Sequence, residues 1–350
     1  MKTIKNKITQ SIKEKLPFVV YNKPKSKEVI GMFQKNDTLF KCTSISLEKG
    51  FVFAPFEDKE NIVLFPFNAC SILKEKMDAS VFELNTTTNF IDSSIDEHQK
   101  LVAKGIKSIK KGEFKKVVLS RKQIQDVSDF DLIETYLKLL SLYSNAFVYV
   151  WYHPKVGLWL GATPETLLKV ESNQFKTMSL AGTQAFKKDL KPSWTDKEIE
   201  EQSLVTTYIV EKLATFSKKI KLSETTSVKA GALWHLKTDI VGMLDETKED
   251  SLEQLIKMLH PTPAVCGLPK NAAKNFILKN ENYNRSFYTG FLGELNMDAK
   301  STNLFVNLRC MQIADNKAII YVGGGITKES DPEKEWKETV SKSNIMRKVL

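Results

Sequence analysis

The sequence predicts an α+β fold built on large antiparallel sheets. Two observations carry this prediction. Short apolar or alternating runs with strand-type residues cluster along the chain, and helical patterns fall between the clusters instead of following every run. The chain also lacks the glycine-rich phosphate loops typical of doubly wound parallel sheets.

The predicted strands are short segments rich in β-branched and aromatic residues. Their ranges are 28–34, 51–56, 61–67, 116–125, 146–152, 156–162, 175–182, 236–244, 286–295, 303–314 and 318–326.

The predicted helices have apolar residues at every third or fourth position and good start signals. Their ranges are 96–112, 130–143, 195–217, 251–259, 271–279 and 332 to about 349. The lysine-rich N-terminus, residues 1–16, has the same spacing and no apolar core of a signal peptide, so we expect an amphipathic helix there.

Composition limits the class of protein. With 350 residues and 42% hydrophobic content the chain can bury a large core, and no run approaches the roughly 20 apolar residues of a membrane span. The net charge of +10 comes from lysines that alternate with acids, which is typical of solvated helix faces. We therefore expect a cytoplasmic protein that binds neither nucleic acid nor membrane and that suits a small anionic substrate.

A polar stretch at 85–99 separates a less patterned N-terminal region from a motif-rich remainder. We interpret it as a boundary within one globule, between residues 1–95 and residues 96–350.

The last predicted helix carries charges on one face. Glu335, Glu338 and Lys342 are spaced i, i+3 and i+7, so they share that face, either as a solvated stripe or as part of a site. The helix follows three glycines, 323–325, at the end of an apolar strand, where a backbone can approach an anion closely or simply turn.

A second acidic helix contains Glu198 and Glu201 one turn apart. If the two acidic helices meet, their carboxylates could hold a hard cation such as Mg²⁺. Solvated surface is the alternative.

Two titratable residues stand at strand ends. Lys116 enters an apolar strand, and a lysine in a dry interior loses its proton more readily, which suits a general base. Glu165 lies between two apolar runs, and a desolvated carboxyl there would keep its proton and act as an acid. A lysine reaching out to solvent and a turn carboxylate in water are the alternatives.

Arg309 falls in the middle of the run 303–314, which we expect to form one strand. A buried guanidinium there must pair with an acid or bind a ligand carboxylate. His235 stands in apolar surroundings without the spacing of a zinc motif, so we expect it to form hydrogen bonds in the interior.

Taken in order, ten short motifs resemble the chorismate-binding enzymes. They are KVVLSR, LGATPE, SLAGT, KEIEEQSLV, LWHLKTDIVG, LHPTPAVCGLPK, RSFYTGFLGEL, NLRC, YVGGGI and EKEWKETVSKS, spread over residues 116–343. The resemblance covers about two thirds of the chain and implies a single α+β domain with two large antiparallel sheets flanked by helices. It marks residues 96–350 as the chorismate-binding catalytic region.

The resemblance also implies a cofactor and a set of site residues. Mg²⁺ would bridge Glu201 and Glu335, with Glu338 acting through water. Arg309 and Tyr288 would hold the enolpyruvyl carboxylate, and His235 would line the ring pocket. The other substrate carboxylate would be held by Gly182, Gly323, Gly324, Gly325 and Lys342.

Within the family, the resemblance favours isochorismate synthase. Lys116 stands where ammonia-using members have glutamine, and Ala264 stands in the HPTPA motif where ammonia-using and salicylate-forming members have threonine. Lys116 would activate water for attack at C2 of chorismate, while Glu165 would protonate the C4 hydroxyl as it leaves.

Three alternatives remain at this stage: a salicylate synthase, an ammonia-using synthase paired with a glutaminase, and a non-catalytic basic binding protein. We expect a monomer without a glutaminase subunit. We expect the product to serve menaquinone biosynthesis, with siderophore biosynthesis as the alternative.

Overall fold

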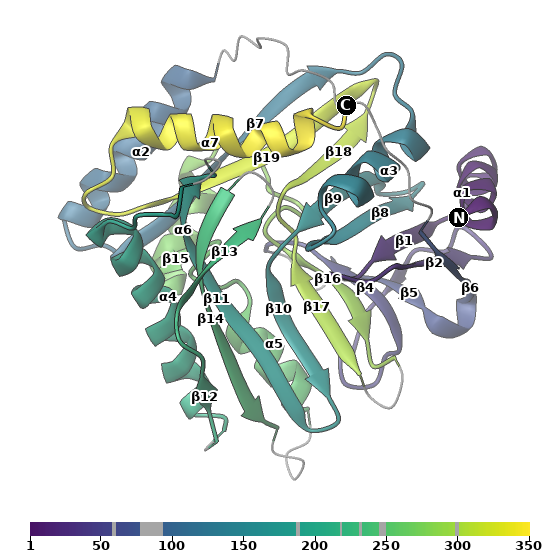
Figure 1. Ribbon diagram of the computed structural model, residues 1–350, viewed down its shortest axis with the longest axis horizontal. Helices are drawn as coiled ribbons and strands as arrows, with labels where there is room; N and C mark the ends of the chain where they lie inside the picture. Colours follow the sequence, from purple (N-terminus) through teal and green to yellow (C-terminus); the bar gives the residue numbers. More distant parts are fainter. Residues whose placement is uncertain are drawn as a thin grey trace.

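The computed structural model describes residues 1–57, 61–77, 94–186, 190–217, 219–230, 233–244, 250–297 and 301–350. Within these ranges the chain forms one domain of two antiparallel sheets with helices on their outer faces, as predicted (Figure 1). Most of the polar stretch 85–99 lies outside the described residues, which resume at Ser94. Of the described helices, none is both long and apolar enough to cross a membrane.

The first sheet, sheet A, contains nine strands whose neighbours all pair antiparallel. Their order is β15 (Gly267–Leu268), β7 (Lys116–Asp126), β19 (Lys317–Ile326), β18 (Cys310–Ala314), β9 (Gly157–Thr163), β8 (Phe147–His153), β1 (Phe18–Asn22), β2 (Glu28–Gln34) and β6 (Cys70–Lys76).

The second sheet, sheet B, contains ten strands. Their order is β12 (Lys221–Leu222), β14 (Leu233–Met243), β11 (Gln174–Ala185), β10 (Thr166–Glu171), β17 (Thr302–Val306), β16 (Phe291–Leu295), β4 (Gly50–Ala54), β5 (Val63–Pro66) and β3 (Phe40–Lys41), and β13 (Thr226–Ala230) also pairs with β14. Residues from the N-terminal quarter therefore add strands to one end of each sheet.

Seven α-helices and one short 3₁₀ turn accompany the sheets in the described residues. They are α1 (Lys2–Glu14), the turn η2 (Phe67–Ala69), α2 (Ile95–Lys110), α3 (Leu132–Leu142), α4 (Asp196–Ala214), α5 (Ser251–Leu259), α6 (Lys270–Asn280) and α7 (Pro332–Arg347). Each predicted helix is confirmed to within a few residues at its ends.

Local chemistry explains where the two acidic helices begin. At the start of α7 the Asp331 side chain accepts a hydrogen bond from the backbone N–H of Lys334 at 2.9 Å, and Pro332 occupies the first turn. At the start of α4, Thr195 and Glu198 form a capping box. Glu198 is therefore engaged as a cap, whereas Glu201, three residues on, is free to face inward.

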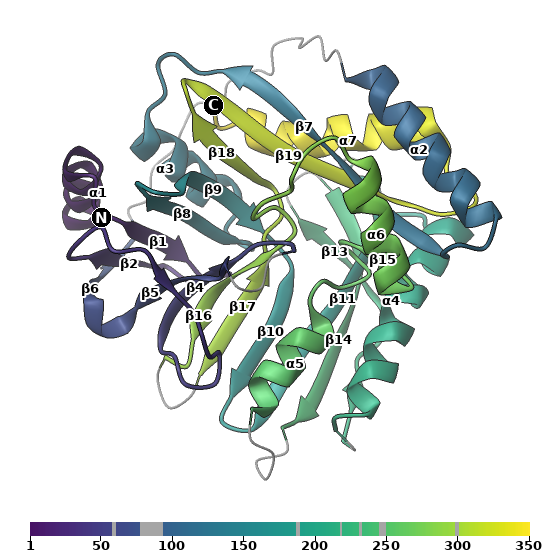
Figure 2. The same cartoon turned by 180° about the vertical axis from the view of Figure 1, so that it is seen from behind.

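The core has three layers of apolar packing. Aromatic side chains such as Phe53, Trp151 and Phe287 fill the space between the sheets. Helices α4 and α5 cover the outer face of sheet B, while α1 and α3 cover part of sheet A; the two views show these helices on opposite sides of the molecule (Figures 1 and 2).

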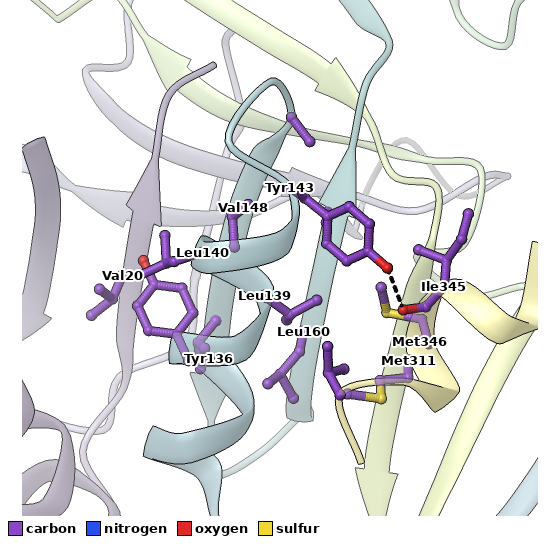
Figure 3. Close-up of a cluster of buried hydrophobic side chains, with 14 of the residues drawn as sticks. Val20, Tyr136, Leu139, Leu140, Tyr143, Val148, Leu160, Met311, Ile345 and Met346 are labelled. Carbon is purple, nitrogen blue, oxygen red and sulfur yellow. Dashed lines mark hydrogen bonds between the residues drawn. The ribbon is translucent and has the colours of Figure 1, made fainter. Parts of the chain in front are cut away.

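The C-terminal end of α7 is fixed by this outer layer. Its residues Ile345 and Met346 pack with α3 in one buried cluster, and the Tyr143 hydroxyl donates a hydrogen bond to the Ile345 carbonyl at 2.9 Å (Figure 3). The acidic face of α7 is thereby held against β19, with which the helix makes extensive contact.

Two strand predictions were wrong. The run 303–314 forms two strands, β17 and β18, because the Asn307 side chain bonds to the Phe287 carbonyl and the Tyr149 hydroxyl, and Arg309 adopts a left-handed φ of 47°. The run 286–295 is a strand only from Phe291, since a turn precedes it in which the Gly290 N–H donates to the Phe287 carbonyl. Both breaks bring polar residues to the same region of the molecule.

Candidate active site

One pocket gathers most of the predicted site residues. It opens between the β7–β19 end of sheet A and the β11–β14 end of sheet B, and α7 closes one side. The predicted residues that line it are Glu165, Gly182, Glu201, His235, Ala264, Tyr288, Arg309, Gly323, Gly325, Glu338 and Lys342.

Three predicted residues lie just behind the pocket surface. Gly324 faces away from the pocket, because successive residues of a strand point to opposite sides. A Cβ atom on Gly324 would lie 3.2 Å from Glu335 Oε2 and 3.8 Å from Glu338 Oε1, so this glycine backs the acidic face of α7. Lys116 is fully buried and contacts Glu201, which itself lines the pocket.

Two glycines are required by close approach or by backbone geometry. A Cβ atom on Gly325 would lie 2.3 Å from Glu201 Oε1, so any side chain there would displace that carboxylate. Gly182 has φ +70° at the point where the β11–β14 register shifts, and this bulge turns the backbone of 182–183 into the pocket.

The acidic end of the pocket consists of Glu201, Glu335 and Glu338. Each carboxylate has its own lysine: Lys116 Nζ lies 2.9 Å from Glu201, Lys197 Nζ lies 2.7 Å from Glu335, and Lys342 Nζ lies 2.7 Å from Glu338. The α4 and α7 helices therefore do meet across β19, as the magnesium hypothesis requires. The solvated stripe considered as an alternative is wrong for Glu335, whose side chain is only 1% exposed.

Burial and neighbouring charges together set the pKa values of the glutamates at this end. Burial alone would raise the pKa of Glu201, but Lys116, Lys342 and Lys197 outweigh it and hold the pKa below its usual range. Burial raises the pKa of Glu335, and the nearby charge of Glu338 raises it further, despite the lysine at its side.

These residues fit a hard divalent cation. Glu335 Oε2 is buried and accepts no hydrogen bond from the part of the chain that the structure describes, and its carboxylate and that of Glu338 approach the same glycine. Within the described ranges no group of three or more His, Cys, Asp or Glu side chains forms a ready-made metal site. Mg²⁺ commonly takes only one or two carboxylates together with water and substrate oxygens, so an incomplete protein ligand set is compatible with it.

The dry end of the pocket contains Glu165. It lies between β9 and β10 and is 3% exposed, so the solvated turn carboxylate considered from sequence is wrong. Burial raises its pKa to about 8, against the opposing charges of Lys116 and Arg309. A carboxyl with this pKa is protonated at neutral pH and can donate a proton to a ligand.

Arg309 and His235 form the second feature of the dry end. Arg309 Nη2 lies 2.6 Å from His235 Nε2, and His235 Nδ1 lies 3.0 Å from the Gly182 carbonyl. Because a guanidinium can only donate, His235 must be neutral, with Nε2 accepting and Nδ1–H donating. Burial first, and then the charges of Arg309 and Lys342, lower the pKa of His235 well below its usual value and favour that form.

Arg309 keeps its charge despite burial, which lowers its pKa to about 10. One hydrogen-bonding contact of Arg309 is the neutral His235 at the pocket wall, and the charge of Glu165 also acts on the guanidinium. Arg309 lines the pocket, so a ligand carboxylate could reach its guanidinium.

Sequence reasoning missed two kinds of site residue. Lys197, which pairs with Glu335, lies four residues before Glu201 on the same helix face, so helical spacing could have identified it. Val118 follows Lys116 by two positions on the same face of β7 and lines the pocket. Lining residues such as Leu308 and Met346 carry no signal in the sequence because they are ordinary apolar residues.

A sequence model described as chorismate binding enzyme matches residues 60–350, so the chain belongs to the chorismate-binding enzyme family. The fold and the pocket agree with this assignment.

Two curated proteins with similar sequences are both named isochorismate synthases. The salicylate biosynthesis isochorismate synthase of Pseudomonas aeruginosa is 29% identical over 74% of this chain and 56% of its own length. The isochorismate synthase DhbC of Bacillus subtilis is 32% identical over 55% of this chain and 50% of its own length. The chain thus spans about half the length of these curated relatives.

Among solved structures, the menaquinone-specific isochorismate synthase MenF from Escherichia coli superposes with a TM-score of 0.76. The match covers 95% of this chain and 88% of MenF at 22% sequence identity. At that identity the likeness supports the shared fold alone.

Proposed function

We propose that this chain is a magnesium-dependent isochorismate synthase, an isomerase that adds water at C2 of chorismate and releases the C4 hydroxyl. The observation that carries the proposal is a pair of buried groups, Lys116 and Glu165, suited to opposite proton transfers at one pocket. Lys116 is fully buried beside Glu201, and Glu165 has a pKa raised to about 8 by burial. Base and acid of this kind are what an addition coupled to loss of a hydroxyl needs.

Lys116 is the proposed general base. Its Nζ lies 2.9 Å from Glu201 Oε1, on a carboxylate that lines the pocket, and would act on a water held beside that carboxylate. In its neutral form the amine takes a proton from this water as the water oxygen bonds to C2. The ring double bonds shift as the C4–O bond breaks.

Glu165 is the proposed general acid. Its protonated carboxyl gives its proton to the departing C4 oxygen, which leaves as water. One water is consumed and one is released, so the reaction is an isomerisation. Exchange of the proton from the Lys116 ammonium to the Glu165 carboxylate through solvent restores both groups for the next turnover.

Glu201 and Glu335 are the proposed magnesium ligands, with Glu338 acting through water. Bound Mg²⁺ would neutralise the ring carboxylate of chorismate and polarise the conjugated ring. The buried, unpartnered Glu335 Oε2 supports this role, as does the raised pKa of Glu335 beside Glu338.

The other predicted residues are proposed to bind and orient chorismate. Arg309, aided by Tyr288, would hold the enolpyruvyl carboxylate, while His235 would line the ring pocket and keep the Arg309 guanidinium in place through their 2.6 Å contact. The ring carboxylate would be held by Gly182, Gly323, Gly325 and Lys342, while Gly324, which faces the other side of β19, would leave room for Glu335 and Glu338. Arg309 and Lys342 would thus provide one cation for each carboxylate of the substrate.

Two residues support isochorismate as the product. Lys116 stands where an ammonia-using member would have glutamine, and Ala264 lines the pocket where a salicylate-forming member would have threonine. The relatives named isochorismate synthase support the same choice. Salicylate synthase, which would follow the same addition with loss of pyruvate, is the second candidate.

The test is to incubate purified protein with chorismate and Mg²⁺, with and without ammonium, and to resolve the products by chromatography. We expect isochorismate without pyruvate, at a rate that ammonium does not change. Pyruvate with salicylate, or an amine-containing product, would overturn the assignment. Near-normal turnover in Lys116→Ala would contradict the role of Lys116 as the general base.

We further propose that the protein acts as a monomer without a glutaminase subunit and supplies menaquinone biosynthesis. Light scattering of the purified protein tests the first statement. Restoration of menaquinone in a bacterial strain lacking its own isochorismate synthase tests the second, and restoration of only a catechol or salicylate siderophore would contradict it.

A further inference from the structure

A buried ion pair outside the pocket joins Glu281, directly after α6, to Arg285. Their side chains are 1% and 2% exposed, and the contact is bidentate, with Arg285 Nε donating to Glu281 Oε2 at 2.8 Å and Nη2 donating to Oε1 at 2.6 Å. Burying two charges is costly unless their remaining hydrogen-bonding positions are also filled. The partners that fill them lie at the pocket.

The pair completes an open edge of sheet A. Strand β7 pairs with β15 only at Lys116 and Val117, and the Val118 N–H then donates to the Cys266 carbonyl. Beyond that point, no strand among the described residues pairs with this side of β7. Arg285 Nη2 donates to the Val118 carbonyl at 2.7 Å, and Glu281 Oε1 accepts from the Ser120 N–H at 2.8 Å. The ion pair therefore bonds the backbone groups that an edge strand would otherwise bond.

The same guanidinium reaches two other walls of the pocket. Arg285 Nη1 donates to the Val265 carbonyl at 3.0 Å and to Thr289 Oγ1 at 3.3 Å. Val118, Val265 and Thr289 all line the pocket. Val118 lies on β7, the strand that carries the proposed base Lys116. Val265 directly follows Ala264, and Thr289 directly follows Tyr288.

We propose that Glu281 and Arg285 are a positioning pair, which holds the Lys116 strand, the Ala264–Val265 turn and the Tyr288–Thr289 turn in one fixed arrangement. This inference rests on the proposed function, because these three walls surround the side from which water would be activated. Only arginine suits the position, since its planar fork directs three nitrogens at fixed angles toward four different residues. Lysine offers a single nitrogen.

The pair should affect the chemical step more than substrate binding. Arg309 and Lys342, which are proposed to hold the substrate carboxylates, stand on other elements and have their own partners, His235 and Glu338. Loosening the three walls would therefore misplace the water and the base and weaken the auxiliary contact of Tyr288, while the charged contacts of Arg309 and Lys342 to the substrate carboxylates remain. Misplacement on the scale of an ångström is enough to cost about 10²-fold in rate.

The test compares Arg285→Lys and Glu281→Gln with wild type in steady-state kinetics. We expect kcat to fall by about 10²-fold in Arg285→Lys and less in Glu281→Gln, with KM for chorismate changed by less than about threefold. Hydrogen exchange should also speed up at the Ser120 amide in both variants, because its acceptor is weakened. A folded Arg285→Lys protein with wild-type kcat would overturn the proposal. So would one in which KM rises by as large a factor as kcat falls.

A matched control separates positioning from general loss of stability. Glu294 is another buried carboxylate, bonded to the Tyr21 hydroxyl at 2.6 Å and to Lys23 Nζ at 2.6 Å, and it is absent from the pocket lining. Glu294→Gln should lower Tm and leave kcat within about twofold of wild type. If it lowers kcat as much as Arg285→Lys at a similar Tm, the Arg285 effect is one of stability and the inference fails.

Counting every product makes the outcome independent of the proposed function. If wild-type protein consumes chorismate but forms salicylate or an amine, the isochorismate assignment fails, and the rate of chorismate consumption still tests the positioning pair. If Arg285→Lys does not fold, Ser120→Ala takes its place. That variant removes one hydroxyl that donates to Glu281 at 2.9 Å, and a kcat equal to wild type there would count against the proposal.

Discussion

The two ends of the pocket treat a buried glutamate in opposite ways. At the acidic end, Glu201 has three lysines near it and its pKa lies below the usual range, although burial acts to raise it. At the dry end, burial dominates and raises the pKa of Glu165 to about 8. The same residue type is thus held charged at one end and neutral at the other. Cations act on both carboxyls, but Glu201 has a direct 2.9 Å ion pair with Lys116 that adds to their effect.

The largest expected effect comes from removing the acid at the dry end. In Glu165→Gln we expect kcat to fall by about 10² to 10⁴-fold, because the amide cannot deliver a proton to the leaving oxygen. KM for chorismate should change little, since size and polarity are kept. Steady-state formation of isochorismate measures both parameters.

Glu171→Gln is the matched control for this variant. Glu171 ends the strand that follows Glu165, but it is exposed and pairs with Lys169 at the surface. Its turnover should equal that of wild type. Near-normal turnover in Glu165→Gln would contradict the role of Glu165 as the general acid.

The next effect tests the acidic end. Chelation of Mg²⁺ should abolish turnover, and Glu335→Gln should raise the Mg²⁺ concentration needed for half-maximal rate by about 10 to 100-fold, because a carboxylate ligand is lost. Titration of activity with Mg²⁺ measures this, and calorimetry of Mg²⁺ binding provides a second readout. The exposed Glu333→Gln on the same helix is the control. An unchanged Mg²⁺ requirement in Glu335→Gln would contradict the ligand assignment.

A smaller effect is expected when the support of Arg309 is removed. His235→Phe keeps the ring shape but cannot accept the 2.6 Å contact from Arg309. A hydrogen bond to a charged group contributes about 1.5 to 3 kcal/mol, so KM for chorismate should rise about 10-fold or more, and kcat should change less. His153→Phe, at a buried histidine absent from the pocket lining, should leave KM unchanged. Equal KM values in the two variants would argue against this role of His235.

The smallest effect is a pH dependence that distinguishes the two ends. Turnover should decline as pH rises through about 8, because Glu165 then loses the proton that it must donate.

The stability of the folded protein should change with pH in the same direction. Since the pKa of Glu165 is raised from 4.5 to about 8 in the folded protein, its contribution to stability is present below pH 4.5 and is lost as pH rises through about 8. As pH rises through about 8, the Tm of wild type should therefore fall relative to the Tm of Glu165→Gln. A difference that does not change with pH would contradict the raised pKa.

Much of the fold could be predicted from local patterns. The helix α5 has the predicted bounds, and α7 begins at the predicted Pro332, because capping residues and helical spacing act over a few residues. The single strand predicted over 303–314 was wrong because its break depends on contacts of Asn307 with residues far away in sequence. Apolar periodicity carries no information about such contacts.

The candidate site divides in the same way. Ordered motifs identified the residues that gather at the pocket, and the sequence by itself determined the family-level resemblance, the charge types and the helix faces that carry Glu201, Glu335 and Glu338. Only the tertiary structure decided the state of each group. It brought Lys116 to Glu201, left Glu165 in a dry wall, paired Arg309 with a neutral histidine and joined three pocket walls through Arg285. A pKa or a hydrogen bond depends on distances between segments far apart in sequence, and folding alone sets those distances.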